Sequence, residues 1–183
     1  MPPLPSPLAM VLRPSAAWTA LRAADPSWLR TFLRHALPLS LLPALAWPLG
    51  QAAAGDLSWT LRALVGLSLS TLALSVAVIL ALAAALCVLA PAFEARRNWN
   101  RSVAVAAYAA TPVLLSGALL LMPVLIMVSV IACLHACALC YGGVQAVLGC
   151  PERDAAFFVA AAGMLSLLAS LVLGGLCSAA GVL

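Results

Sequence analysis

Three long runs without any charged side chain dominate the pattern of hydrophobic and polar positions along the chain. They cover residues 63–93, 102–151 and 155–183. A membrane-spanning helix needs only ~20 apolar residues, so each run is long enough to cross a bilayer and the middle run is long enough for two spans. The runs lack the period-two alternation of barrel strands, and they therefore predict membrane-spanning helices.

The pattern predicts an all-α, polytopic membrane protein built as a five-transmembrane-helix bundle. The middle run is expected to break at Met122-Pro123, because proline has no amide hydrogen and disfavours helix at the residue before it. A further apolar stretch contains Pro38, Pro43 and Pro48, and predicts a kinked, closely packed first span. Within a membrane domain of residues 31–183, the spans are expected at residues 32–54, 63–90, 103–121, 124–148 and 155–180.

Residues 1–30 are expected to form a cytoplasmic tail followed by a short interfacial helix. The proline-rich start, Met1–Pro7, favours a segment without regular structure. Residues Pro14–Ala24 then read as a helix with Trp18 and Leu21 on one face. That face favours a helix lying on the cytoplasmic leaflet. The alternative is a plain connecting helix packed on the bundle.

Composition and charge support a membrane location and orient the chain. Hydrophobic residues make up 66% of the sequence and charged residues 8%, too few to cover a soluble domain. All nine basic residues are arginine, and if the N terminus is cytoplasmic only Arg62 lies outside. The arginines flank the spans, which suits lipid headgroups and argues against nucleic acid. The lysine-free composition, rich in Ala, Leu and Arg, favours a GC-rich bacterial genome, and we expect a bacterial cytoplasmic (inner) membrane protein. Five spans that start from a cytoplasmic N terminus place the C terminus outside.

Catalytic motifs are absent from the sequence. Apart from Arg34 near the start of the first, the predicted spans contain no Asp, Glu, Lys or Arg, the residues that usually mark ion paths and proton relays. There is no Gly-rich phosphate loop, Gly-x-Ser-x-Gly or His-Glu-x-x-His. With two histidines and five carboxylates in the chain, we expect no enzymatic activity and no cofactor.

Three cysteines share one face of the predicted fourth span. Cys133, Cys137 and Cys140 follow one another at i, i+4 and i+7, and a soft ion such as Cu(I) would suit their sulfurs. His135 lies about 200° around the helix from Cys133 and cannot join them. Because buried cysteine is also a small hydrophobe, we expect reduced thiols and no metal site. His135 is expected to be a hydrogen-bonded core histidine.

The most polar stretch of the chain is Leu89–Arg101, which we call the basic loop. It lies between the second and third predicted spans, on the cytoplasmic side. Its arginines suit lipid headgroups, and its Asn-Trp-Asn core offers more specific hydrogen bonding than lipid requires. The alternative is a plain topology signal. The residues expected to contact a partner or lipid are Glu94, Arg96, Arg97, Asn98, Trp99, Asn100 and Arg101.

Two motifs within and after this loop carry a family resemblance. The first is Leu89, Ala90 and Pro91, and the second is an Ala-Tyr-x-x-Thr-Pro motif with Tyr108, Thr111 and Pro112. In this order they resemble the central signature of the Ypt/Rab-interacting protein (Yip) domain family, in its bacterial branch. The opening Val11–Pro26 is similar to the family's Arg-Pro…Trp opening, while Glu94-Ala95 stands where Gly-Gly is more common. The resemblance implies a five-helix bundle with a cytoplasmic N terminus and no established reaction.

These observations predict a non-enzymatic integral membrane protein that organises protein partners or lipids through the basic loop and the N-terminal helix. The alternative is a channel or carrier for a neutral solute or a soft metal ion, suggested by the prolines of the first span and the cysteine face. The expected partners are the lipid bilayer and a membrane protein. A ladder of small residues would also suit a homodimer: Ala162, Ser166, Ser170, Gly174 and Ser178.

Overall fold

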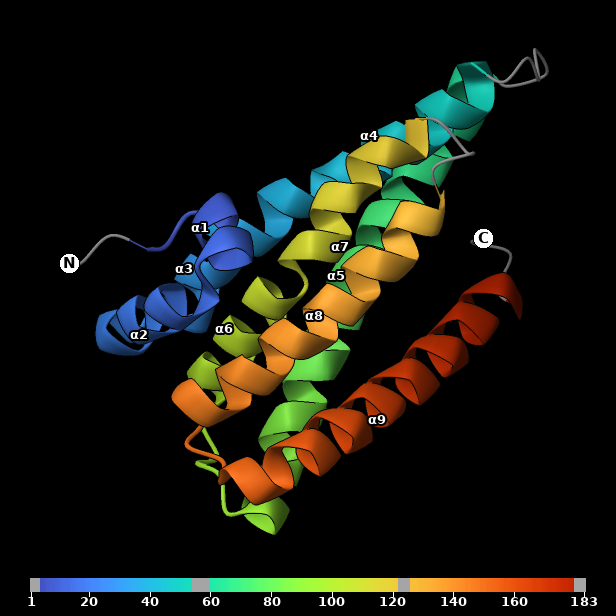
Figure 1. Ribbon diagram of the computed structural model, residues 1–183. Coiled ribbons are helices and arrows are strands. Elements are labelled where there is room, and N and C mark those ends of the chain that lie inside the picture. Colours follow the sequence, from blue (N-terminus) through green and yellow to red (C-terminus); the bar gives the residue numbers. More distant parts are fainter. Residues whose placement is uncertain (1–3, 54–59, 122–125, 180–183) are drawn as a thin grey trace.

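The computed structural model describes residues 4–53, 60–121 and 126–179, and within these ranges every regular element is helical (Figure 1). Proline opens several of the helices, at a position where its missing amide hydrogen costs nothing. The elements are α1 (Pro7–Leu12), α2 (Pro14–Ala24), α3 (Trp28–Thr31), π-helical η1 (Phe32–Ala36), α4 (Leu37–Ala53), α5 (Leu61–Leu89), 3₁₀ η2 (Ala90–Phe93), α6 (Trp99–Ala109), α7 (Thr111–Ser116), 3₁₀ η3 (Gly117–Leu121), α8 (Ile126–Ala146) and α9 (Glu152–Ala179).

Four helical segments of the described chain are long and apolar enough to cross a membrane. They are Leu61–Phe93, Trp99–Leu121, Met127–Ala146 and Glu152–Val172. They correspond to four of the five predicted spans. The first predicted span, residues 32–54, is represented by η1 and α4 and is not among the four. The predicted break at Met122-Pro123 lies outside the described residues.

The long helices run side by side along one direction, with α1, α2 and α3 gathered at one end (Figure 1). Helix α9 packs along α5, and α6 lies between α5 and α8. Ala162 and Ser166, the first two members of the small-residue ladder on α9, are buried inside the chain. This part of the ladder therefore serves packing within the bundle.

Helix α4 approaches η3 closely because small residues face each other there. A β-carbon added to Gly117 would lie 2.7 Å from Cβ of Pro43. A β-carbon added to Gly50 would collide with the backbone carbonyl of Leu120. The proline-rich α4 is therefore closely packed, as its sequence predicted, because glycine at these two contacts lets the backbones approach.

The apolar face of α2 packs against the bundle. Trp18 and Leu21 are 2% and 1% exposed, and the Trp18 ring lies beside Gly142 and Gly143 of α8. The sequence prediction placed this face against lipid. The observed burial favours the alternative, a helix packed on the bundle, because the two glycines leave room on α8 for the indole ring.

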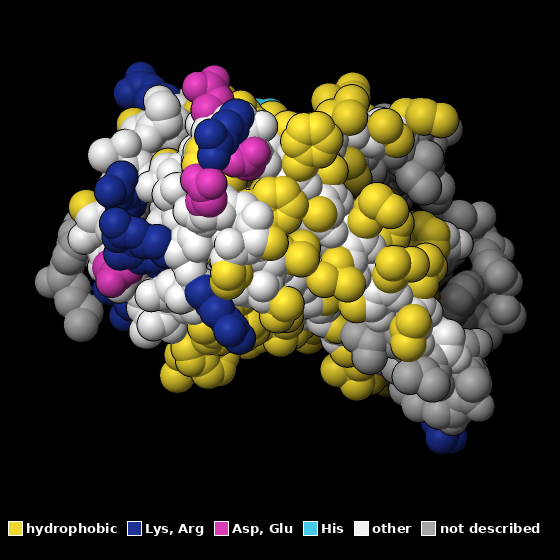
Figure 2. Space-filling view, turned by 90° about the horizontal axis from the view of Figure 1, so that it is seen from below, with side chains coloured by type: hydrophobic (Ala, Val, Ile, Leu, Met, Phe, Trp, Pro, Cys, Tyr) yellow, Lys and Arg dark blue, Asp and Glu magenta, His cyan; other side chains and the backbone are white. Residues whose placement is uncertain are grey.

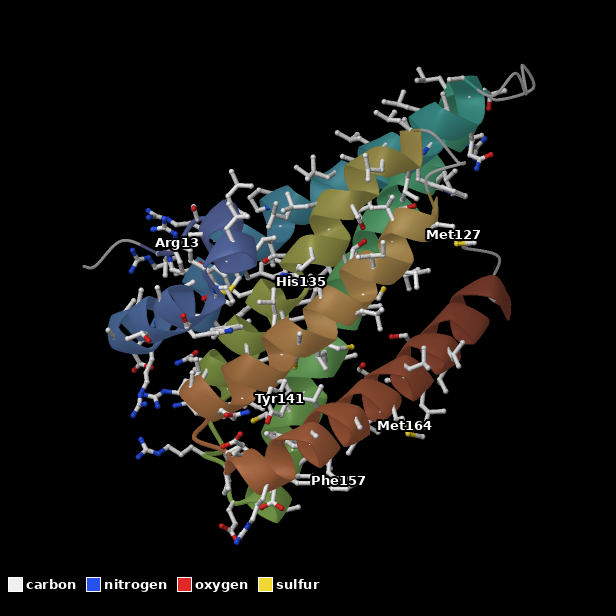
Figure 3. The ribbon with its side chains drawn as sticks, in the orientation of Figure 1. Arg13, Met127, His135, Tyr141, Phe157 and Met164 are labelled. Carbon is white, nitrogen blue, oxygen red and sulfur yellow. The ribbon has the colours of Figure 1, made fainter. Side chains whose placement is uncertain are left out.

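The outer surface divides into an apolar part and a charged end. Figure 2 shows charged side chains gathered towards one end of the molecule, with hydrophobic side chains spread over the middle of this face. On the outer side of α9, Phe157 and Met164 point away from the bundle and are 73% and 67% exposed (Figure 3). Exposed apolar side chains on this scale are suited to lipid rather than water.

Candidate functional site

The basic loop is held at the charged end of the bundle by contacts with α9 and with the connection that precedes it. The carboxylate of Glu94 accepts a hydrogen bond from Arg153 over 2.9 Å, and the amide of Arg96 donates to the carbonyl of Leu148 over 2.9 Å. Glu94 has a left-handed backbone, with φ of 54°. Glycine adopts this conformation most easily, so Glu94 stands at a turn whose backbone is strained for a residue with a side chain.

Contacts with the N-terminal segment fix the second half of the loop. Asn98 caps α6, its side chain accepting from the amide of Arg101 over 3.1 Å. Asn100 accepts from the amide of Trp28 over 3.0 Å, and Arg101 donates to the carboxylate of Asp25 over 3.0 Å. These side chains therefore join the start of α6 to the start of α3.

Three predicted contact residues of the loop remain directed outwards. The side chains of Arg96, Arg97 and Trp99 are exposed, and Trp99 is 39% accessible. Within the described residues, neither arginine has an ion-pair partner. Of the seven residues predicted to contact a partner or lipid, these three are therefore the ones most available for binding outside the chain.

The first family motif forms the end of α5. Leu89 closes α5, and Ala90 and Pro91 begin the 3₁₀ turn η2. Ala90 is fully buried, and its carbonyl accepts from the amide of Ala95 over 2.9 Å. The motif thus turns the chain out of α5 and into the basic loop.

In the second family motif, the proline leaves one backbone carbonyl without its usual hydrogen-bond donor. The carbonyl of Tyr108 would normally accept from the amide four residues later, but Pro112 has no amide hydrogen. Instead, the hydroxyl of Thr111 donates to this carbonyl over 2.7 Å. Threonine side chains are known to satisfy backbone groups freed by proline in membrane helices, which explains the spacing of the motif.

His35 contacts this motif through Thr111, and nothing in the sequence indicated this contact. Its Nε2 lies 2.9 Å from the hydroxyl of Thr111. Because that hydroxyl donates to Tyr108, it accepts from Nε2–H of His35. The rings of His35 and Tyr108 also stack, with centroids 3.8 Å apart. Both side chains are buried, so the motif joins α6 and α7 to η1, the turn that leads into α4.

The three cysteines of α8 line one apolar cavity, and they therefore share one face of the helix. The cavity has a volume of about 350 Å³ and lies among α5, α6, α7, α8 and α9. Cys140 is buried, whereas Cys133 and Cys137 are exposed. In the part of the chain that the structure describes, no three His, Cys, Asp or Glu side chains are placed to hold a metal ion.

His135 differs from its predicted role as a hydrogen-bonded core histidine. It is only partly buried and lies midway along α8 (Figure 3), where it lines a groove of about 580 Å³ between α2 and α8. Among the described atoms, Nε2 of His135 and Nε1 of Trp18 have no hydrogen-bond partner. The prediction of a hydrogen-bonded core histidine was therefore wrong, although the hydroxyl residues Ser15 and Thr19 of α2 line the same groove.

Cys150 lies behind the basic loop, in the connection between α8 and α9. It is 5% exposed, and its thiol lies 3.6 Å from the carbonyl of Phe93. Burial raises the pKa of the Cys150 thiol, and the carboxylates of Asp154 and Glu94 raise it further. The thiol is therefore protonated and poorly nucleophilic at neutral pH.

In a variant whose sole cysteine is Cys150, alkylation by iodoacetamide is expected to be slow near neutral pH and to accelerate only above the ordinary thiol pKa of about 8.5. Intact-mass measurements over a pH series would follow the rate, with the unfolded chain as reference. Substituting Glu94→Gln and Asp154→Asn together is expected to shift the profile to lower pH. Equal rates in the folded and unfolded chains near neutral pH would contradict the prediction.

The family model of the Yip1 domain matches residues 8–174 of the chain. The match covers every helix from the start of α1 to the last turns of α9. No curated protein matches the chain at a significant level, and no solved structure does.

Proposed function

Because the chain belongs to the Yip1 domain family, we propose that it is a non-enzymatic membrane protein that organises protein partners or lipids at the bacterial cytoplasmic membrane. The family and the apolar helices identify a multi-helix membrane protein in contact with the bilayer. The observation that carries the proposed role is the basic loop, which hydrogen bonds and ion pairs join to its neighbours on both sides while Arg96, Arg97 and Trp99 remain exposed. Exposed charged and aromatic side chains on a loop positioned by a scaffold are typical of a binding surface.

The charge distribution supports a five-span bundle with a cytoplasmic N terminus and an outside C terminus. The basic loop, the α8–α9 connection and the N-terminal helices are joined at one end through Arg101 and Arg153. Arg62 begins α5 at the other end. An excess of arginine at one end favours a cytoplasmic location for that end, and the run from Trp28 to Ala53 then supplies the first span.

The proposed role is tested by crosslinking in native membranes from a photoreactive residue at position 99, followed by mass spectrometry of protein and lipid adducts. We expect a defined set of adducts that decreases about fivefold for each arginine removed in Arg96→Gln and Arg97→Gln variants, because a basic residue near a membrane surface contributes about 1 kcal/mol. Arg22→Gln is the matched control, since Arg22 is exposed on α2, outside the loop. An adduct profile unchanged in the loop variants would contradict the proposal.

A second candidate function is a channel or carrier for a neutral solute or a soft metal ion. The cavity lined by Cys133, Cys137 and Cys140 favours this candidate, because it lies among the membrane-spanning helices. Its lining is nearly all apolar, which suits a neutral solute better than a charged one. If crosslinking gave the same adducts for every loop variant, the channel or carrier function would be preferred over the organising role.

A further inference from the structure

A second cavity, separate from the basic loop, lies where the N-terminal tail crosses the start of the first proposed span. Its volume is about 340 Å³. One wall is formed by residues Leu4–Pro7 of the tail. The opposite wall is formed by Arg30, Arg34, His35 and Tyr108. Two arginines and a tyrosine therefore line one hollow at the charged end of the bundle.

The helix that carries the arginines is reshaped at this cavity. In a regular helix the amide of residue 38 would donate to the carbonyl of Arg34, but Pro38 has no amide hydrogen and its ring crowds that carbonyl. The helix widens into the π-helical turn η1, in which the amide of Leu37 donates to the carbonyl of Phe32. This turn contains Arg34 and His35, both of which line the cavity. Turns of this kind are rare and often occur at functional sites.

On one wall of the cavity, packing contacts hold the ring of Tyr108 in place, and its hydroxyl is a hydrogen-bond donor. Stacking on His35 fixes the Tyr108 ring, and Thr111 in turn fixes His35. The hydroxyl of Tyr108 lies 3.5 Å from the carbonyl of Pro5, at the outer limit of hydrogen-bonding distance. Because Tyr108 is covered by the tail, a stronger acceptor reaches this hydroxyl by displacing the Pro5 carbonyl, which is a weak partner at this distance.

The charge of the cavity is positive, and the nearby carboxylates are engaged elsewhere. Asp25 pairs with Arg101, while Glu94 and Asp154 pair with Arg153. Arg34 is exposed and has no carboxylate partner among the described residues. Arginine matches the oxygens of a phosphate group with paired hydrogen bonds, so a phosphate is the ligand group that this wall fits best.

Neighbouring apolar side chains indicate that the phosphate is attached to a lipid. Leu29 and Leu33, on the same helix as the two arginines, are 48% and 50% exposed. Arginines at the beginning of a span lie at the depth of the headgroups. We propose that the cavity between the tail and η1 binds the phosphate of an anionic lipid headgroup, with Arg30, Arg34 and the Tyr108 hydroxyl as the groups that hold it.

The test measures binding of phosphatidic acid to the purified full-length chain by native mass spectrometry, with phosphatidylcholine as the comparison lipid. We expect phosphatidic acid to bind at least tenfold more tightly, and Arg34→Gln to weaken its binding about tenfold, because a hydrogen bond to a charged group contributes that much. Tyr108→Phe is expected to produce a smaller loss. Arg34→Gln is preferred to Arg30→Gln because Arg30 also has an interaction within the chain.

Arg13→Gln and Arg22→Gln are the matched controls, since both residues are exposed at the same end but lie outside the cavity. Equal losses in these variants and in Arg34→Gln would overturn the proposal, because they would show general attraction to anionic lipid. Binding of inorganic phosphate or glycerol phosphate as tight as that of phosphatidic acid would overturn the lipid assignment. The Arg96→Gln and Arg97→Gln variants are expected to bind phosphatidic acid normally, so this result is independent of the basic loop.

Discussion

Replacing Tyr108 by alanine is expected to lower the free energy of unfolding by about 3–5 kcal/mol, the range typical of a large aromatic side chain lost from a packed core. Tyr108 is fully buried and is among the largest side chains with no accessible surface. Its loss leaves a cavity and removes the stacking partner of His35. For a chain of this size, we expect the unfolding temperature in detergent to fall by roughly 6–20 °C.

Tyr108→Phe is the control for this variant. It keeps the ring and its stacking on His35 and removes only the hydroxyl, whose hydrogen bond to Pro5 is long. We therefore expect a loss of under about 1 kcal/mol. Similar unfolding temperatures for the alanine and phenylalanine variants would show that the stacked pair contributes little to stability.

Gly50→Ala is expected to destabilise the chain by about 3 kcal/mol, at the upper end of the usual range for overpacking. The added methyl group would meet the carbonyl of Leu120 and the backbone of Leu121. Backbone atoms move less readily than a side-chain end, so α4 and η3 must separate. Thermal unfolding followed by size-exclusion chromatography in detergent is expected to show a decrease of roughly 6–12 °C.

Gly66→Ala is the matched control, because Gly66 lies in α5 and a β-carbon there would meet nothing within 4 Å. Alanine is also the better helix former by about 1 kcal/mol. We expect the stability of this variant to be unchanged or slightly higher. Equal destabilisation at Gly50 and Gly66 would indicate that helix propensity, rather than the contact between α4 and η3, determines the effect.

The residues of the candidate site differ in how far the sequence predicted their roles. Exposure of Arg96, Arg97 and Trp99 was predictable, because a charged segment between two apolar runs has to lie at a membrane surface. The structural roles of Asn100 and Arg101 were not. Their partners, Trp28 and Asp25, lie more than 70 residues earlier in the chain. No local sequence pattern indicates which polar groups at the same end of the bundle pair with one another.

His35 is the clearest residue that sequence reasoning missed. It lies beside Arg34 at the beginning of an apolar stretch, where it resembles one more charged flanking residue. Its contact with Thr111 joins positions 76 residues apart. The nearest signal in the sequence was Pro38, which predicts an irregular helix at that point. It does not indicate which side chain the irregular turn directs into the bundle.

The sequence by itself determined that this protein is helical, crosses a membrane and concentrates its arginines at one end. Lipid requires every backbone amide to be satisfied within the chain, so an uncharged apolar run has few structural options. The tertiary structure decided the pairings: Trp18 against α8, Gly50 against η3, and His35 on Tyr108. These depend on how the helices fit together, and in lipid that fit is determined by the shapes of small residues and by single hydrogen bonds rather than by hydrophobic periodicity.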